Sequence, residues 1–395
     1  MVIRSIRGTL VLMSTVLAVL GAVSGSARAV SVTITGPQET VFDWTTQRCD
    51  DSDIPDGPVY ALRDSLGRAQ LIMPSYATRR MIGPDFDHLT RDCTPIFTSL
   101  VDPNPAHYSY LQYLNGTYTE NGRDIYALLH DEWHGWEIPG ACPAGPGKRR
   151  CGVGGITFAV SHNNGDSYSQ PAPPDNFVAT VPPRPTVDDG RTGLFQPTAP
   201  VKLGNYFYSI ALIGAVGDQD AGACALRTRD VTDPASWRGW DGTGFGVHFR
   251  NPYYESLRPA IVNTCEPISY ENILAMTRSV TFNTVLNKFV LTGSAVKFDP
   301  ASSQNIYGFY FSLSDDLVHW SMRQLLMQIP SATSHVCGGP DSGSYPALID
   351  PDATDPNLRI TDDTVDLYYS VQHYNAACQI TQDVDLVRVP IQFSP

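Results

Sequence analysis

Several motifs that assign common enzyme classes are missing from this sequence. It has no G-x-S-x-G nucleophile motif, no glycine-rich phosphate loop and no helical nucleotide-binding motif, which removes the classes that depend on them. A Ser/His/Asp triad stays open, because its members meet only in space. No C-x-x-C pair occurs, so the spacing excludes a zinc ribbon.

Basic residues are scarce, with 27 Lys and Arg against 40 Asp and Glu and a formal net charge of −13. Residues 1–29 are expected to be a secretory signal peptide, because Arg4 and Arg7 precede an apolar run and Ala27-Arg28-Ala29 is a cleavage signal. Its removal takes three arginines and no acid, so the charge moves from −13 to −16. Such a surface repels phosphate backbones and makes nucleic acid an unexpected partner. An anionic substrate would need a local cluster of arginines.

Long apolar runs are absent after residue 29, so we expect a secreted, extracellular protein with no membrane contact once the signal peptide is cleaved. No Ser- or Pro-rich linker divides the remaining chain. We therefore predict a single domain over residues 30–395, acting as a monomer.

The eight cysteines are even in number and follow a signal peptide, which favours disulfide bonds over metal ligands. Spacing alone does not fix their connectivity. We predict pairing between neighbours along the chain, and the short loop between the third and fourth cysteines makes their pair the firmest. The predicted bonds are Cys49–Cys93, Cys142–Cys151, Cys224–Cys265 and Cys337–Cys378.

Helical periodicity is also scarce, and short strand-like runs recur instead between turn signals. Residues 125–129, 156–160 and 206–213 are clear examples. Many such runs follow a small turn such as Glu120-Asn121-Gly122, which is typical of antiparallel hairpins. The pattern predicts an all-β fold.

A weak internal repeat follows three of these runs, at residues 161–168, 228–237 and 314–320. Each copy has a small hydroxyl residue, then Asp or Asn two positions later, then an aromatic residue. An Asx side chain in such a turn satisfies backbone donors while the aromatic ring packs on a neighbouring strand. Three unrelated Asx-turns would give the same pattern, so that alternative stays open.

The first copy resembles the Asp-box of sialidases, with Asn163 and Tyr168 in place of Asp and Trp. The other two resemble turns of five-bladed β-propeller glycoside hydrolases of the arabinanase, β-xylosidase and invertase groups. This resemblance implies a five-bladed β-propeller, with six blades as the alternative. It predicts blades near residues 54–100, 107–170, 192–248, 256–326 and 343–393, with residues 30–53 and the last strand closing the ring. These turns concern the fold and do not point to catalytic residues.

Residues 125–136 begin as an apolar run and end in a concentration of acidic, histidine and tryptophan side chains. If it is extended, His130, Glu132 and His134 share one face, and Asp131 and Trp133 share the other. Asp131 and Glu132 are candidate catalytic carboxylates. The histidines, with Trp133 or Trp136, are candidates to bind a sugar ring.

Asp56 opens the first expected blade. Glycoside hydrolysis needs two carboxyl groups with separated pKa values on either side of the glycosidic oxygen. The position of Asp56 resembles the place where the propeller hydrolases carry their base or nucleophile. Asp53 is an equal rival, and either residue could instead be a turn aspartate before a strand.

Four further residues are candidates for substrate binding: Arg79 and His88 on a charged stretch, Arg258, and Glu266 beside a cysteine. An Arg–Asp surface network would explain Arg79 equally well, and a loop carboxylate would explain Glu266. A sialidase needs three arginines around a carboxylate, and Arg79, Arg80 and Arg258 are candidates. No F-R-I-P-type opening is present, which makes a sialidase-like enzyme the weaker alternative.

No cofactor or catalytic metal is expected. Over four strand residues, His130 and His134 would be about 13 Å apart, too far to share one ion. A structural Ca²⁺ in an acidic central channel stays open. The sequence therefore predicts a secreted glycoside hydrolase-like protein of carbohydrate metabolism that acts on a poly- or oligosaccharide. A propeller that binds glycan or protein without chemistry is the alternative.

Overall fold

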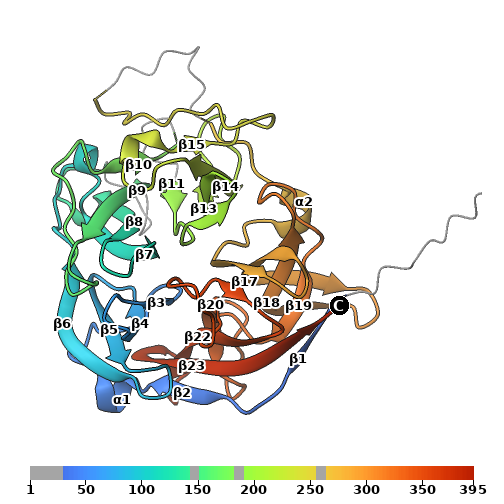
Figure 1. The fold of residues 1–395 in the computed structure, drawn as a ribbon. Helices are drawn as coiled ribbons and strands as arrows, with labels where there is room; N and C mark the ends of the chain where they lie inside the picture. The colour runs from blue at the N-terminus through green and yellow to red at the C-terminus, as the bar shows by residue number, and fades with distance from the viewer. Residues whose placement is uncertain (1–29, 143–150, 182–190, 255–263) are drawn as a thin grey trace, which may run out of the picture.

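The computed structural model describes residues 30–142, 151–181, 191–254 and 264–395 (Figure 1). The fold is all-β, with 49% of residues in strands and 5% in helices. No helix in the described ranges is long and apolar enough to cross a membrane. The expected signal peptide, residues 1–29, and Arg258 lie outside the described residues.

The first sheet is a four-stranded antiparallel meander, in which each strand pairs with the next. Its strands are β3 (Tyr60–Arg63), β4 (Ala69–Met73), β5 (Ala77–Gly83) and β6 (Thr90–Thr98). β4 is buried along its whole length, and its one polar residue, Gln70, is satisfied by hydrogen bonds to Asp64 and to the Asn164 carbonyl.

The second sheet has nine strands and consists of two antiparallel groups joined by one parallel pair, β9 with β11. The first group holds β7 (Leu111–Thr119), β8 (Ile125–His134), β9 (Gly152–Ser161) and β10 (Phe177–Ala179). The second holds β11 (Arg191–Phe195), β12 (Val201–Leu203), β13 (Tyr206–Gly214), β14 (Gly222–Thr228) and β15 (Arg238–Gly239).

Glycine makes the β9–β11 junction possible. A Cβ atom on Gly193, whose φ is +116°, would lie 2.1 Å from the carbonyl oxygen of Gly154. A Cβ atom on Gly154 would lie 2.4 Å from the ring of Phe195. Larger residues at either glycine would push the two strands apart.

The third sheet is again antiparallel, apart from a short parallel strand at its edge. Its strands are β16 (Ser279–Asn283), β17 (Lys288–Asp299), β18 (Gln304–Ser314), β19 (Gln324–Gln328) and the edge strand β21 (Ile360–Thr361).

The fourth sheet joins the two ends of the described chain. The long last strand β23 pairs with β22 on one side and with β1 and β2 on the other. This confirms the expectation that the N-terminal residues close the structure against the final strand. The strands are β20 (Ser342–Ile349), β22 (Thr364–Tyr374), β23 (Ile380–Ser394), β1 (Ser31–Ile34) and β2 (Glu39–Phe42).

Helices are short and serve as connections. The carboxylate of Asp43 caps the first by accepting a hydrogen bond from the Thr46 amide. The α-helices are α1 (Trp44–Gln47) and α2 (Tyr270–Ile273), and the 3₁₀ turns are η1 (Pro105–His107), η2 (Gly135–Glu137) and η3 (Pro234–Ser236).

Hydrophobic clusters fill the spaces between neighbouring sheets. One cluster lies between β3–β4 and β7–β9, the next between β8–β10 and β11–β14, and a third between β13–β14 and β16–β18. A fourth lies between β17–β18 and β20–β23, and a fifth between β20–β23 and β3–β4. Figure 1 shows the sheets around a common centre, and the clusters join each to the next in chain order.

The three predicted Asx-turns follow β9, β14 and β18, each of which is the third strand along the hydrogen-bonded paths β7-β8-β9, β11-β13-β14 and β16-β17-β18. The hydroxyl of Ser161 accepts the Gly165 amide at 3.0 Å, and the hydroxyl of Thr228 accepts the Asp230 amide at 2.9 Å. In the third turn, Asp316 Oδ1 accepts the His319 amide at 2.8 Å. These turns stabilise the loops by satisfying their amides locally.

All four predicted disulfides are confirmed: Cys49–Cys93, Cys142–Cys151, Cys224–Cys265 and Cys337–Cys378. Each bond joins two consecutive cysteines of the eight along the chain. Each bond therefore holds one local segment, and the large-scale arrangement of the sheets depends on packing.

Candidate functional site

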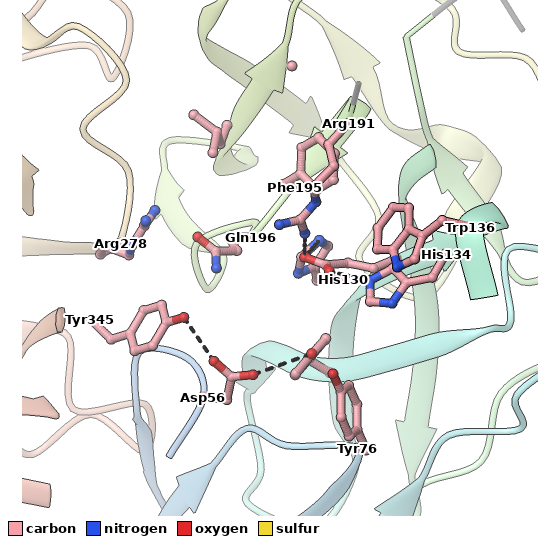
Figure 2. Close-up of a pocket in the computed structure, with 14 residues that line it drawn as sticks. Asp56, Tyr76, His130, His134, Trp136, Arg191, Phe195, Gln196, Arg278 and Tyr345 are labelled. Carbon is pink, nitrogen blue, oxygen red and sulfur yellow. Dashed lines mark hydrogen bonds and ion pairs between the residues drawn. The ribbon is translucent and has the colours of Figure 1, made fainter. Parts of the chain in front are cut away.

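A central cavity lies where the sheets converge and has a volume of about 510 Å³, within the range of small-molecule sites. Residues that open or precede strands in four sheets line it (Figure 2). The lining residues are Asp56, Tyr76, Tyr113, His130, Glu132, His134, Trp136, Arg191, Phe195, Gln196, Leu212, Gly214, Arg278 and Tyr345.

The strands place these side chains in a regular way. Asp56 precedes β3, Tyr113 lies near the start of β7, Arg191 opens β11, and Arg278 immediately precedes β16. Tyr345 lies in the first half of β20. The first strand of each antiparallel group therefore points its N-terminal end at the cavity, and rigid strands hold polar groups from distant parts of the chain together.

Asp56 is the first carboxyl group of the cavity. The Tyr345 hydroxyl donates a hydrogen bond to its Oδ1 at 2.9 Å, and the Tyr113 hydroxyl donates to Oδ2 at 3.4 Å. Burial raises the pKa of Asp56 to about 6, and the charge of Glu132 adds to this effect while the phenolic hydrogen bonds oppose it. A large fraction of Asp56 is therefore protonated in mildly acidic solution.

Glu132 is the second carboxyl group, and one arginine and two histidines surround it. Arg191 forms an ion pair with its Oε1, and His134 Nε2 lies 3.0 Å from its Oε2. His130 Nε2 lies 3.4 Å from Oε1. Burial pushes the pKa of Glu132 up, but His130, His134 and Arg191 outweigh it and bring the value to about 2. Glu132 is therefore ionised across the ordinary pH range.

The face prediction for β8 is confirmed, because His130, Glu132 and His134 line the cavity together. The two histidines lie on either side of one carboxylate, an arrangement that the separation along the strand did not predict. Both rings lean toward Glu132, which lies between them. Burial lowers the pKa of His130 to about 4, so this ring is neutral near pH 7.

Asp131 and Trp133 point away from the cavity, as the alternation requires, and their predicted roles at the site receive no support from this geometry. Asp131 Oδ1 accepts the Tyr110 amide at 2.8 Å, and burial raises the pKa of Asp131 well above its usual range. The Trp133 indole donates to the carbonyl of Pro103 at 2.8 Å. Trp136 is the indole that lines the cavity, with its ring centroid 4.2 Å from that of His134.

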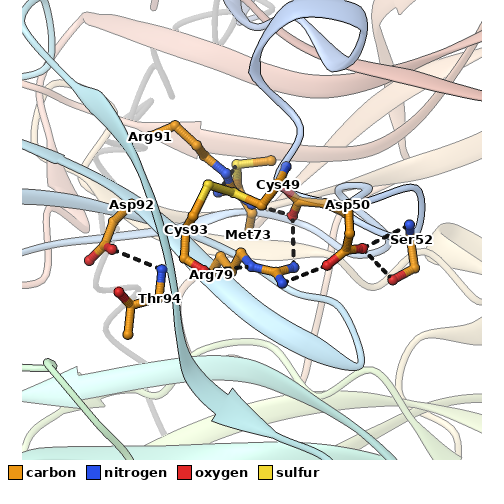
Figure 3. The surroundings of a disulfide bond; sticks show 10 residues. Cys49, Asp50, Ser52, Met73, Arg79, Arg91, Asp92, Cys93 and Thr94 are labelled. Carbon is orange, nitrogen blue, oxygen red and sulfur yellow. Dashed lines mark hydrogen bonds and ion pairs between the residues drawn. A yellow bond between two sulfur atoms is a disulfide. The ribbon is translucent and has the colours of Figure 1, made fainter.

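The predicted binding residues Arg79 and His88 are not brought to the cavity. Arg79 is buried beside the Cys49–Cys93 bond, where it pairs with Asp50 at 2.6 Å and contacts Asp53 at 3.5 Å (Figure 3). Asp53 also forms an ion pair with Arg91, so this rival of Asp56 belongs to a structural network. His88 is on the surface beside Asp85.

Glu266 lies in a second, smaller cavity with Asp218, Asp220 and Asp241, away from the central one. Glu266 is therefore one of several acidic residues that line this smaller cavity, and its predicted contact with substrate in the central cavity is not supported. Arg258, the remaining binding candidate, falls outside the described residues.

Sequence reasoning missed Arg191, Gln196, Arg278 and Tyr345. In a propeller, the first strand of each blade points its N-terminal end at the centre. Applied to every group of strands, this rule would have identified Arg191 and Arg278. Gln196 and Tyr345 have positive φ values of 47° and 57°, an uncommon conformation for such residues. Such strain concentrates at functional sites, but the sequence gives no sign of it.

Among the described residues, the group of side chains best arranged to hold a metal ion lies outside the cavity. That group is His373, Asp383 and Asp385, whose ligand atoms lie within 4.8 Å of one another. His373 already contacts Asp385 at 3.1 Å and Asp341 at 2.7 Å, so an Asp–His–Asp network explains the arrangement without an ion.

Comparisons with known proteins give structural matches alone. No family model matches the chain, and no curated protein does. The catalytic domain of an α-L-arabinofuranosidase from Coprinopsis cinerea shares 10% identity over 89% of this chain and 95% of that one, with a TM-score of 0.45. An α-L-arabinofuranosidase from Podospora anserina, in complex with cellotriose, shares 8% over 90% and 95%, with a TM-score of 0.44.

An α-L-arabinanase from Cellvibrio cellulosa shares 11% identity over 84% of this chain and 90% of that one, with a TM-score of 0.43. Arabinanases are among the enzymes that the turn motifs resemble, so the resemblance is confirmed as a structural match. TM-scores below 0.5 at this identity transfer no activity, and the chemistry rests on the residues of this chain.

Proposed function

We propose that this protein is a secreted glycoside hydrolase that cleaves a poly- or oligosaccharide, with Asp56 and Glu132 as its catalytic pair. One observation carries the proposal: two carboxyl groups from different parts of the chain face one cavity with pKa values of about 6 and about 2. Two carboxyl groups with separated pKa values are what acid–base cleavage of a glycosidic bond requires.

We infer further that the fold is a five-bladed β-propeller. The nine-stranded sheet counts as two blades, because its halves are antiparallel groups joined by the parallel β9–β11 pair. Five hydrophobic clusters then join five blades in a closed order. In this arrangement each first strand contributes to the central cavity.

For Asp56, the electrostatics favour the role of acid in place of the base or nucleophile that the family resemblance implies. Asp56 keeps its proton in mildly acidic solution and is suited to donate it to the glycosidic oxygen as the bond to the anomeric carbon breaks. Glu132 is ionised and acts at the anomeric carbon, either directly or by taking a proton from an attacking water. Asp131 is left out of this assignment, because it faces away from the cavity.

Aromatic side chains supply the sugar platform. Trp136 and Tyr76 line the cavity, and the flat faces of indole and phenol bind the apolar face of a sugar ring. A carbohydrate-binding propeller without chemistry would use the same rings, so the two carboxyl groups distinguish the two functions.

Hydrolysis of a panel of plant and microbial polysaccharides, measured as released reducing ends, tests the proposal. We expect activity on at least one polymer and a loss of at least a hundredfold in both Asp56→Asn and Glu132→Gln. Asp85→Asn, on the surface, is the matched control and should retain full activity. Full activity in both site variants would overturn the assignment, and tight binding without cleavage would favour the binding protein.

A further inference from the structure

Arg278 is the cation of the cavity that lacks a counterion. Its guanidinium donates to the carbonyl and hydroxyl oxygens of Thr277, while its Nε is buried without a partner. It forms no ion pair with any carboxylate of the described residues. Burial lowers the pKa of Arg278, as expected for a charge held without an opposite one. Arg278 is partly buried, and its guanidinium lies 5.8 Å from the centroid of the Tyr345 ring. A partly buried cation without an ion pair is costly to a fold, so its retention beside a cavity points to a ligand.

The remaining charges of the cavity are already matched. Arg191 and His134 bind Glu132, and the hydroxyls of Tyr345 and Tyr113 hold Asp56. With Asp56 protonated, Glu132 and Arg191 cancel and the charge of Arg278 remains. The cavity is then locally positive in a chain whose formal net charge is −13.

Gln196 adds neutral donors to this part of the cavity. Its side chain lines the same space and has no hydrogen-bonding partner among the described residues. Figure 2 shows Arg278 and Gln196 on the side opposite Trp136, with Tyr345 below them in this view. A ligand seated on Trp136 would therefore extend its polar groups toward the guanidinium.

We propose that the cavity binds a sugar residue carrying an anionic substituent, a carboxylate or a sulfate, and that Arg278 receives it. The planar guanidinium can donate two parallel hydrogen bonds to either group. The inference rests on the proposed function for the carbohydrate part of the ligand, and it adds the charge of that ligand.

Matched ligand pairs that differ in charge alone test the proposal. Binding to the full-length secreted protein is measured by titration calorimetry at low ionic strength. The carboxylate arm compares oligomers of galacturonic and of glucuronic acid with their methyl esters, and the sulfate arm compares a sulfated galactose disaccharide with its unsulfated form. We expect one charged ligand to bind roughly tenfold to a hundredfold more tightly than its neutral partner, and the arm that shows this identifies the anion.

Three variants assign the effect to Arg278. Arg278→Gln should abolish the preference for the charged ligand. Arg278→Lys should retain part of it, since lysine keeps the positive charge but lacks the paired N–H donors of the guanidinium. Arg123→Gln removes the same charge from an exposed position and should leave the preference unchanged. Circular dichroism melting curves check folding, and Arg278→Lys keeps the test valid if Arg278→Gln does not fold.

The outcomes separate this inference from the hydrolase proposal. Equal affinity within every pair, or an unchanged preference in Arg278→Gln, would overturn the anionic ligand even if a neutral polysaccharide is cleaved. A preference for the charged ligand that depends on Arg278 would support the inference even if no bond is cleaved. Absence of binding by every charged ligand overturns it as well, while the polysaccharide panel decides the hydrolase separately.

Discussion

The hydroxyl of Tyr345 donates a hydrogen bond to Asp56 across 289 positions of sequence, at 2.9 Å. Tyr345 reaches this place because β20 shifts register between Ser344 and Ala347, and Tyr345 itself has a φ of +57°. This irregular backbone turns a phenol from the last sheet onto a carboxyl group that precedes the first. The ionisation of Asp56 therefore depends on a contact between the two ends of the fold.

Removal of that hydroxyl should move the pH profile of the proposed hydrolase activity. The hydrogen bond from Tyr345 lowers the pKa of Asp56 and so opposes burial. In Tyr345→Phe the pKa of Asp56 should rise above about 6, and the alkaline limb of kcat/KM should shift upward by about half a unit to one unit. Tyr206→Phe, which removes a hydroxyl that accepts a hydrogen bond from Arg229 and does not line the cavity, is the control. A shift to lower pH would contradict the role of Asp56 as the acid.

Asp56→Asn should be inactive yet more stable in neutral solution. Because the folded pKa of about 6 exceeds the ordinary value of 3.8, neutral Asp56 favours the folded state below pH 3.8, and this contribution is lost as pH rises through 6. Asparagine stays neutral, so the free energy of unfolding of the variant should exceed that of the wild type by on the order of 2 kcal/mol at pH 8 and by little at pH 3.5. Urea unfolding at the two pH values measures the difference, and an equal effect at both would refute the explanation.

The Arg191→Gln substitution should change the acid limb of the pH dependence of activity. Burial disfavours ionised Glu132, and the charge of Arg191 is one of the interactions that overcome this effect. Without it, the pKa of Glu132 should rise from about 2 by at least one unit, so the acid limb of activity moves to higher pH. Arg191→Lys keeps the charge and should retain most of the wild-type profile. An unchanged acid limb in Arg191→Gln would exclude Glu132 as the ionised partner.

The Cys49–Cys93 bond should contribute more stability than Cys142–Cys151. The sequence separations are 44 and 9 residues, and loop-closure entropy gives about 4 kcal/mol for the longer loop and roughly 2.5 kcal/mol for the shorter. The longer bond also lies beside the buried Arg79–Asp50 ion pair (Figure 3). Double serine variants compared by thermal melting should show the larger loss for Cys49/Cys93, and the reverse order would contradict this reasoning.

Local patterns in the sequence predicted much of this molecule. Alternation along β8 placed His130, Glu132 and His134 on one face, because strand geometry fixes the direction of successive side chains. Asp56 was found because it precedes an apolar run that opens a sheet. Neighbour pairing gave the four disulfides, because each cysteine pair belongs to one local segment.

Contacts between sheets could not be predicted in this way. Arg278 and Tyr345 approach the cavity only because the sheets close on one another, and no local pattern encodes which strand ends meet. Arg79 looked functional because it stands in a charged stretch, but burial beside Asp50 and Asp53 makes it structural. Single-sequence reasoning identifies charged residues, and tertiary packing decides which of them reach the site.

The pairing of β1 and β2 with β23 also constrains synthesis. β1 and β2 have no strand partner among the described residues until β23 has been made, and the cavity lacks Tyr345 until β20 is in place. The lining of the cavity is therefore complete only once β20 has folded against the earlier sheets.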